Sequence, residues 1–257
     1  MVGRDRCESH GRQAGLVAFH AHPDNEALVT GGTLARVAAE GHRVVLAAAT
    51  DGEAGAASAL GCARVVRFGL PDSGWNRTER PASGTFSQLA VADAAAPLIE
   101  LLREEQADAL TIYDPAGGYG HPDHQQIHAP GVQAARAAGT RLVLEATIDR
   151  KAIQRLVRVV EAIPGVLPDV HASDYAAAYS PPEAITHRID VRPYADAKRR
   201  AFAAHASQAT ADQGARTLAL LLKLPPWLFR RALGQEWFVE HGRRPDRPLD
   251  DVFATLR

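Results

Sequence analysis

The chain has 257 residues, of which 46% are apolar, and its 29 basic and 30 acidic residues give a formal charge of −1. This composition is that of an ordinary globular protein and argues against intrinsic disorder. The balanced charge leaves no basic excess to hold a phosphate backbone, so we expect no nucleic-acid partner.

The expected elements alternate between strands and helices. In chain order they are a strand at 15–21, a helix ending at Gly41, strands at 43–49 and 63–69, a helix at 91–106, a strand at 109–113, a helix at 125–138, a strand at 141–147 and a helix at 151–162. Strands and helices joined by short polar links are typical of right-handed crossovers onto a parallel sheet. We therefore predict an α/β fold, a doubly wound, Rossmann-like and mostly parallel sheet with helices on both faces. Such a sheet binds its ligand at the carboxyl ends of the strands.

The chain changes character from about residue 171, which predicts a smaller C-terminal subregion. This part contains an apolar run at 185–191, a helix at 194–208 and an apolar stretch at 218–233. Lys223 and the pair Pro225-Pro226 interrupt that stretch, so it cannot span a membrane. Because amphipathic spacing normally means burial, we expect a packing helix pair there rather than a substrate lid.

The cysteines and the first residues bear on location. Cys7 and Cys62 lie far apart and form no CxxC pair, so we expect free thiols in a reducing compartment. Residues 1–14 are polar and lack the apolar core of a signal peptide, and no window reaches the ~18 apolar residues of a membrane span. The sequence predicts a soluble, cytoplasmic protein with a flexible arm over 1–14 and one domain over 15–257.

Two polar segments follow predicted strands. Residues 22–26 (HPDNE) come directly after the first strand, and residues 120–124 (GHPDH) follow the strand ending at residue 113. A catalytic zinc site usually has three protein ligands and an open position for water, and imidazole is a common ligand. His22 and His124, with an oxygen from the first loop, could supply that set. Asp24 and His121 would then be free to move protons in metal-assisted hydrolysis.

These segments resemble the LmbE-like, or PIG-L, family of metal-dependent N-acetylglucosaminyl deacetylases. The run YDPAGGYGHPDH at 113–124 is especially similar to mycothiol-pathway and related actinobacterial members. Further similarity lies in TDGEAG at 50–55, DSG at 72–74 and HASQ at 205–208, and the resemblance covers roughly residues 15–240.

The resemblance implies a role for each matching residue in the two segments. His22, Asn25 and His124 would bind the metal, zinc or another divalent ion. Asp24 would be the general base, and His121 would stabilise the oxyanion or protonate the leaving amine.

The resemblance also implies supporting roles around these groups. Asp123 would orient the catalytic histidine. Tyr119 would lie beside the reacting carbonyl, and Glu53 and Asp72 would line the sugar pocket. Trp75, just past Asp72, offers an apolar face for the sugar ring or aglycone, although such a tryptophan is more often a packing residue.

The chain departs from the family pattern in two places. Asn25 stands where the family has an aspartate, which removes one negative charge from the ligand set. Between Gly55 and Gly61 the chain lacks a longer helix with an RxxE pattern that helps to hold the substrate. The missing segment predicts an aglycone that differs from those of the family members it resembles, and the apolar stretch at 218–233 suggests an aglycone that is partly hydrophobic.

The resemblance predicts a zinc-dependent hydrolase that releases acetate from a small N-acetylglucosamine conjugate and needs no organic cofactor. We expect a small-molecule amino-sugar partner, and a homo-oligomer is left open. A nucleotide-binding Rossmann module is one alternative, but no strand is followed by the glycine-rich phosphate turn that it needs. A metal-free binding protein is another, suggested only by Asn25. His128, one helical turn beyond His124, is the nearest competing ligand, although a lone helical histidine more often packs or faces solvent.

Overall fold

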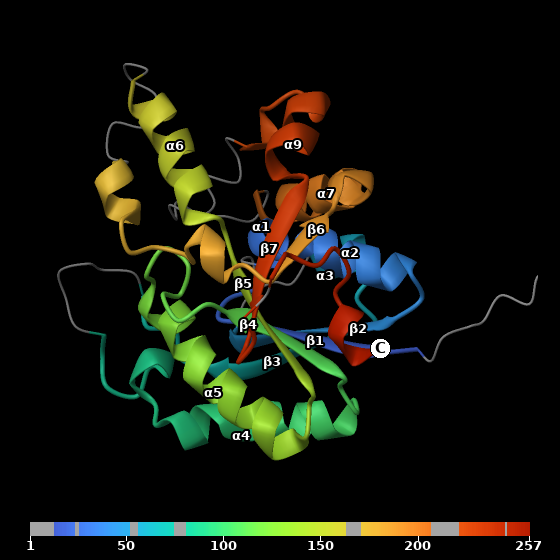
Figure 1. Cartoon of the computed structure of the whole chain (residues 1–257). Coiled ribbons are helices and arrows are strands. Elements are labelled where there is room, and N and C mark those ends of the chain that lie inside the picture. The colour runs from blue at the N-terminus through green and yellow to red at the C-terminus, as the bar shows by residue number, and fades with distance from the viewer. Residues whose placement is uncertain are drawn as a thin grey trace, which may run out of the picture.

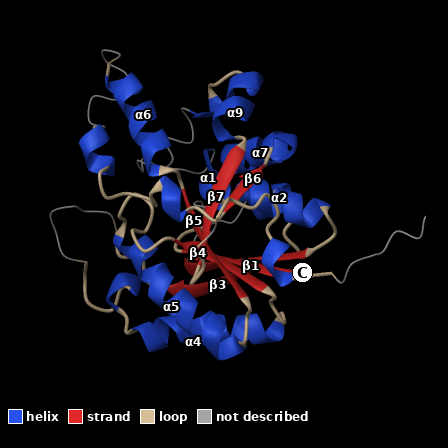
Figure 2. Cartoon of the chain, viewed as in Figure 1, coloured by secondary structure: helices blue, strands red, loops and turns tan. Residues whose placement is uncertain are grey.

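Seven strands form one sheet in the order β3-β2-β1-β4-β5-β7-β6, with helices on both faces (Figures 1 and 2). A computed structural model describes residues 13–23, 26–51, 56–74, 81–162, 171–206, 221–244 and 246–257. The strands are β1 (Gly15–His20), β2 (Arg43–Thr50), β3 (Arg64–Leu70), β4 (Ala109–Tyr113), β5 (Leu142–Thr147), β6 (His187–Asp190) and β7 (Gln235–Glu240). The helices are α1 (Glu26–Val29), α2 (Gly31–Ala39), α3 (Ala56–Ala59), α4 (Val91–Glu104), α5 (Pro122–Ala138), α6 (Arg150–Glu161), α7 (Ala195–Ala206) and α9 (Pro226–Leu233).

The direction of the strands locates the ligand-binding edge. Strands β1 to β5 are paired in parallel, whereas β7 runs antiparallel to both β5 and β6. The chain builds outward from β1 through β2 to β3 and then returns to place β4 on the other side of β1. The loops after β1 and β4 therefore leave the sheet in opposite directions and open a crevice between them, which is where doubly wound sheets bind ligands.

Most of these elements match the predicted doubly wound, mostly parallel sheet. The strand β4 has the predicted bounds, and the other strands that the sequence indicates differ by one or two residues at their ends. Helix α5 begins at Pro122 rather than at the expected residue 125, so the second polar segment forms the first turn of this helix. Strand β7 was not expected, and together with β6 it adds the C-terminal part of the chain to the main sheet.

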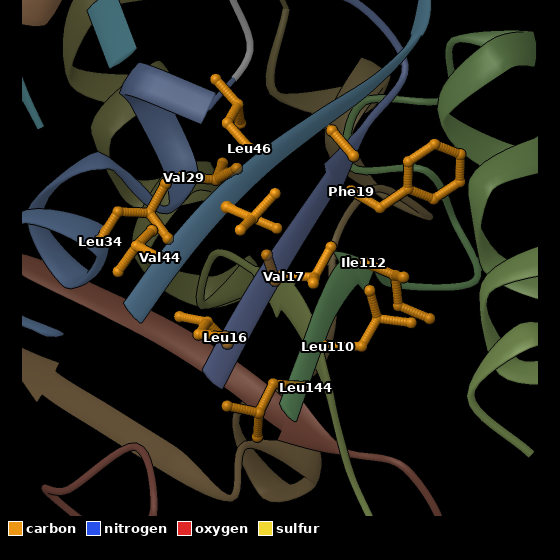
Figure 3. Packing of buried hydrophobic residues seen from close by; sticks show 14 of the residues in the cluster. Leu16, Val17, Phe19, Val29, Leu34, Val44, Leu46, Leu110, Ile112 and Leu144 are labelled. Atoms are coloured by element: carbon orange, nitrogen blue, oxygen red, sulfur yellow. The ribbon is translucent and has the colours of Figure 1, made fainter. Parts of the chain in front are cut away.

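The core fills both faces of the sheet. Helices α4 and α5 pack on one face, and α2 and α7 lie on the other. Figure 3 shows Leu34 of α2 and Phe19 of β1 on opposite sides of the strands. Helix α5 approaches β4 closely because Gly131 has no side chain, and a Cβ added there would lie 2.5 Å from Cγ2 of Ile112. This close contact fixes the helix that carries the second polar segment.

The C-terminal helix α9 is held by apolar packing. Phe229 is buried and its ring meets that of Phe202 in α7 at 5.4 Å between centroids. Trp227 of the same helix is exposed. The described part of the 218–233 stretch therefore packs on α7, as the amphipathic pattern predicts, while residues 207–220 lie outside the described ranges.

A buried ion pair ties β7 to two helices. Lys198 Nζ of α7 lies 2.6 Å from Glu236 Oε1 of β7, and only 1% and 2% of these side chains are exposed. The two carboxylate oxygens of Glu236 also accept the backbone N–H groups of Gly32 and Thr33, each at 2.8 Å, in the first turn of α2. A carboxylate is favoured at this end of a helix because the helix dipole is positive there. The pair therefore joins β7, α7 and α2.

Two expectations about location can be compared with the structure. None of the helices in the described part of the chain combines the length and apolarity that crossing a bilayer requires. Cys62 forms no disulfide, in agreement with the expected thiol, and Cys7 lies outside the described residues.

Candidate functional site

The sequence of the second polar segment itself builds the start of α5. His121 is the N-cap residue, and its Nδ1 accepts the backbone N–H of Asp123 at 3.1 Å. Pro122 takes the first helical position, where its missing N–H has no helical partner to lose. This capped turn holds His121, Asp123 and His124 at the end of β4, directly opposite the loop that follows β1.

Three imidazoles meet at this edge of the sheet. The ring centroids of His22 and His121 are 4.9 Å apart, those of His22 and His124 are 5.5 Å apart, and those of His121 and His124 are 4.9 Å apart. His121 and His124 are buried, and His22 is partly exposed. The two predicted segments thus form one cluster.

Two carboxylates lie against His22. Its Nε2 is 3.2 Å from Oδ2 of the buried Asp123 and 3.3 Å from Oδ2 of Asp72. Burial lowers the pKa of His22, but the hydrogen bonds to Asp123 and Asp72 outweigh burial and raise that pKa to about 9. The same contact holds the pKa of Asp72 below its usual range. The position therefore attracts a positive charge, either a proton on His22 or a metal ion.

His124 has the properties of a ligand. Its Nε2 is buried and has no hydrogen-bond partner among the residues that the structure describes. Burial, and then the neighbouring imidazoles, hold the pKa of His124 well below its ordinary value, so the ring is neutral. Metals bind the neutral form of imidazole. The ring stacks on Tyr113 with centroids 4.5 Å apart, and the Tyr113 hydroxyl contacts Nδ1 of the buried His20 at 2.8 Å, so its orientation is fixed.

The described residues offer a second set of donors for a metal. Ligand atoms of His22, His121 and Asp123 all lie within 4.8 Å of one another. The predicted set is His22, Asn25 and His124, and it stays a prediction because Asn25 lies outside the described residues. Both sets share His22. Imidazole nitrogens together with a carboxylate or amide oxygen suit a divalent metal ion, so the residues present fit such an ion.

A buried aspartate shapes the loop between β4 and α5. Asp114 accepts the N–H of Gly118 at 3.0 Å and the hydroxyls of Thr147 and Ser180 at 2.5 Å and 3.3 Å. Burial raises the pKa of Asp114. The loop turns sharply at Gly117, which has a φ of +65°. It passes so close to α5 that a Cβ added at Gly117 would lie 2.5 Å from the backbone nitrogen of Gln125.

This loop brings Tyr119 to the histidines. Its ring centroid is 5.1 Å from that of His124 and 6.3 Å from that of His121, and the side chain is exposed. A small open hollow lies beside these rings. It is lined by Leu28, Val29, Tyr113, Gly118, Tyr119, His124, Ala146 and Tyr179. Walls that are mostly apolar and aromatic suit a small apolar group such as an acyl methyl.

Six of the predicted site residues lie together in the structure, namely His22, Asp72, Tyr119, His121, Asp123 and His124. The other four, Asp24, Asn25, Glu53 and Trp75, lie outside the described residues.

Two contacts in the cluster differ from those expected. The Asp123 carboxylate contacts His22 and accepts the N–H of Ser73 at 3.0 Å, and the hydrogen bond between Asp123 and His121 is the one that the Asp123 backbone N–H donates. Asp72, expected in the sugar pocket, contacts His22. The sequence analysis gave Ser73 and Asp114 no role of their own. Asp114 directly follows β4, and a polar residue at the end of such a strand is itself an indication of a ligand-binding position.

The competing histidine does not join this cluster. His128 Nε2 lies 2.9 Å from Oε1 of Glu145 in β5.

Known proteins are similar to this chain in sequence and in fold. The family model described as GlcNAc-PI de-N-acetylase (PIG-L) matches residues 17–135. A protein of Rhodococcus opacus (strain B4) named 1D-myo-inositol 2-acetamido-2-deoxy-alpha-D-glucopyranoside deacetylase is 33% identical over 94% of this chain and 98% of its own length. A protein of the same name from Streptomyces griseus subsp. griseus is also 33% identical, over 77% of this chain and 75% of its own length.

A solved structure extends the similarity in fold. The N,N'-diacetylchitobiose deacetylase from Pyrococcus horikoshii, complexed with its inhibitor MPG, superposes with a TM-score of 0.56. The match covers 89% of this chain and 84% of that one at 15% sequence identity, so it supports the fold alone.

Proposed function

We propose a substrate class and a mechanism from the premise that this chain belongs to the PIG-L family of N-deacetylases, which hydrolyse amide bonds. The reaction is removal of the acetyl group from the amide nitrogen of a small N-acetylglucosamine conjugate. A divalent metal ion, which we propose is zinc, assists the reaction. The observation that carries the proposal is the cluster of His22, His121 and His124 at the switch point of the sheet.

The two polar segments divide the work. His22 and His124, with the side-chain oxygen of Asn25, would hold the metal, which when bound lowers the pKa of water and polarises a carbonyl oxygen. Asp24 takes a proton from the attacking water. His121 stabilises the oxyanion or gives a proton to the leaving amine. The carbon–nitrogen bond breaks as a carbon–oxygen bond forms, so the products are acetate and a free amine.

The surrounding side chains hold the substrate in place. Tyr119 stands close enough to the histidine rings to contact the reacting carbonyl. The apolar hollow beside His124 is suited to the acetyl methyl. Glu53 and Asp72 are acceptors for sugar hydroxyls, and Trp75 would stack on the ring or aglycone. Binding by Asp72 requires that it exchange its contact with His22 for one with the sugar.

The substrate is expected to be a conjugate rather than a polymer or the free sugar. The relatives are named for an inositol glycoside of N-acetylglucosamine, which is a small molecule. This chain lacks the RxxE segment between Gly55 and Gly61, so its aglycone should differ from inositol. The apolar stretch at 218–233 suggests that this aglycone includes an apolar part.

A screen of N-acetylated amino sugars tests this proposal. Free N-acetylglucosamine, its inositol glycoside, aryl and alkyl glycosides and a chitin oligomer are incubated with the zinc-loaded protein, and the free amine is measured. We expect the highest kcat/KM on conjugates with an apolar aglycone. Equal rates on free sugar and on every conjugate would contradict an aglycone pocket, and no amine from any of them would favour the metal-free alternative.

Asn25 provides a second prediction. Changing Asn25→Asp restores a charged oxygen to the ligand set and should tighten zinc binding by about tenfold. The reason is that an interaction with a charged group is stronger than the same interaction with a neutral group by about 1 kcal/mol or more. Competition with a chelator of known affinity measures the change. An Asn25→Ser variant, with a shorter neutral oxygen, is the matched control and should bind more weakly. Weaker zinc binding by Asn25→Asp than by the unchanged protein would exclude Asn25 as a ligand.

A further inference from the structure

A second group of possible metal donors lies outside the proposed active site. His128 of α5, Glu145 of β5 and His241, which directly follows β7, converge from three elements. Glu145 Oε1 is 2.9 Å from His128 Nε2 and 2.8 Å from His241 Nδ1. The ligand atoms of all three side chains lie within 4.8 Å of one another. The deacetylase mechanism uses none of them.

The spacing of these atoms is close to that of a metal site. In a tetrahedral zinc site with bonds of about 2.0–2.1 Å, neighbouring ligand atoms are about 3.3 Å apart. Each histidine nitrogen here is slightly closer than that to the shared carboxylate oxygen. An outward movement of a few tenths of an ångström, with loss of the shared protons, would convert the hydrogen-bonded group into a three-ligand set.

The electrostatic surroundings favour a cation. The Glu145 side chain is 7% exposed, so water screens its charge poorly. Within the described part of the chain, no lysine or arginine lies at ion-pairing distance from Glu145, and its side-chain partners are the two imidazoles. A divalent ion would supply the charge that this buried carboxylate lacks.

An ion can reach the group from solvent, because the side chains of His128 and His241 are 21% and 40% exposed. Two imidazoles and one carboxylate suit zinc and the neighbouring divalent transition metals rather than Mg²⁺ or Ca²⁺, which prefer oxygen ligands. We propose that His128, Glu145 and His241 form a second binding site for a divalent transition-metal ion such as zinc. Such an ion would join the end of β7 to α5, one helical turn from His124 (Figure 1).

Counting bound metal on the full chain tests this inference. After incubation with excess zinc and gel filtration, elemental analysis should give about two zinc ions per chain for the unchanged protein. His128→Gln and His241→Gln should each lower this count by about one, because glutamine keeps an N–H donor for Glu145 but is not a usual zinc ligand. His171→Gln is the matched control, since His171 also contacts a carboxylate, that of Glu161, outside this group. It should leave the count unchanged.

A second measurement separates this site from the proposed active site. In a His124→Ala background, zinc should still raise the unfolding temperature by a few degrees, because binding to the folded chain alone stabilises it. Adding His241→Gln should abolish that rise, whereas adding His171→Gln should not. A zinc count that His128→Gln and His241→Gln leave unchanged would overturn the inference. So would a zinc-dependent rise that is as large in the His124→Ala, His241→Gln protein as in the His124→Ala protein, whatever the outcome for deacetylase activity.

Discussion

His124→Ala and His22→Ala are each expected to remove the catalytic metal and the deacetylase activity together. His124 presents a buried Nε2 without a partner among the described residues, and His22 lies between two carboxylates. Losing either imidazole leaves too few ligands to hold the ion, and without the ion the water is not activated. His121→Ala should instead retain the metal and lower kcat by about 10²–10⁴-fold, the usual contribution of a general acid or base. Elemental analysis and release of free amine measure the two properties on the same samples.

These variants are best compared in a His241→Gln background, so that zinc at the proposed second site is not counted. His171→Gln serves as the control for loss of a histidine elsewhere. The alternative donor set, His22, His121 and Asp123, predicts the same result for His22→Ala but the opposite results for His121→Ala and His124→Ala. If His121→Ala loses the metal while His124→Ala retains it, the assignment of His124 as a ligand is wrong and His121 is a ligand instead.

Glu236→Gln is expected to destabilise the fold by about 3–5 kcal/mol, the usual effect of removing one partner from a buried ion pair. Lys198 is 1% exposed and would lose the carboxylate that lies beside it. The neutral amide would also be a weaker acceptor for the N–H groups of Gly32 and Thr33. Urea unfolding followed by circular dichroism measures the loss.

The matched control is an exposed ion pair. Glu100 and Arg103 of α4 lie 3.5 Å apart with side chains 79% and 55% exposed, so Glu100→Gln should change the stability little. The double variant Lys198→Met, Glu236→Leu should recover much of the stability lost in Glu236→Gln, because no unpaired charge remains. Equal stability of Glu236→Gln and the unchanged protein would refute the importance of this pair.

The parallel strands could be predicted because their signal is local. All five residues of β4 are buried, and only Thr111 interrupts its apolar residues, so the strand stands out as a short apolar run. Strand β7 has no such signal. Its inward-facing positions include Glu236, whose partner Lys198 lies 38 residues earlier in the chain. A charged residue at a core position obscures the alternation of apolar and polar residues that identifies a strand, and only the tertiary structure shows how that charge is compensated.

Part of the proposed site could likewise be predicted from the sequence, namely the part formed by the two polar segments. A polar segment after each of two strands places His22 near His121 and His124 once the sheet is parallel. The approach of Asp72 to His22 depends on the path of the chain after β3, which periodicity does not describe. The same limit applies to His128. Its position on the helix was apparent, but its partners Glu145 and His241 come from other elements.

The position of β7 also has a consequence for the order in which the chain is made. This strand lies between β5 and β6, although it is synthesised after both of them. Until residue 240 has left the ribosome, β6 has no neighbour in the sheet and β5 has an open edge. Open edges are the surfaces that chaperones shield and that aggregate when left exposed. Completion of the sheet therefore coincides with translation of the last strand, and a nascent chain that stalls earlier carries an unpaired edge that distinguishes it from the finished protein.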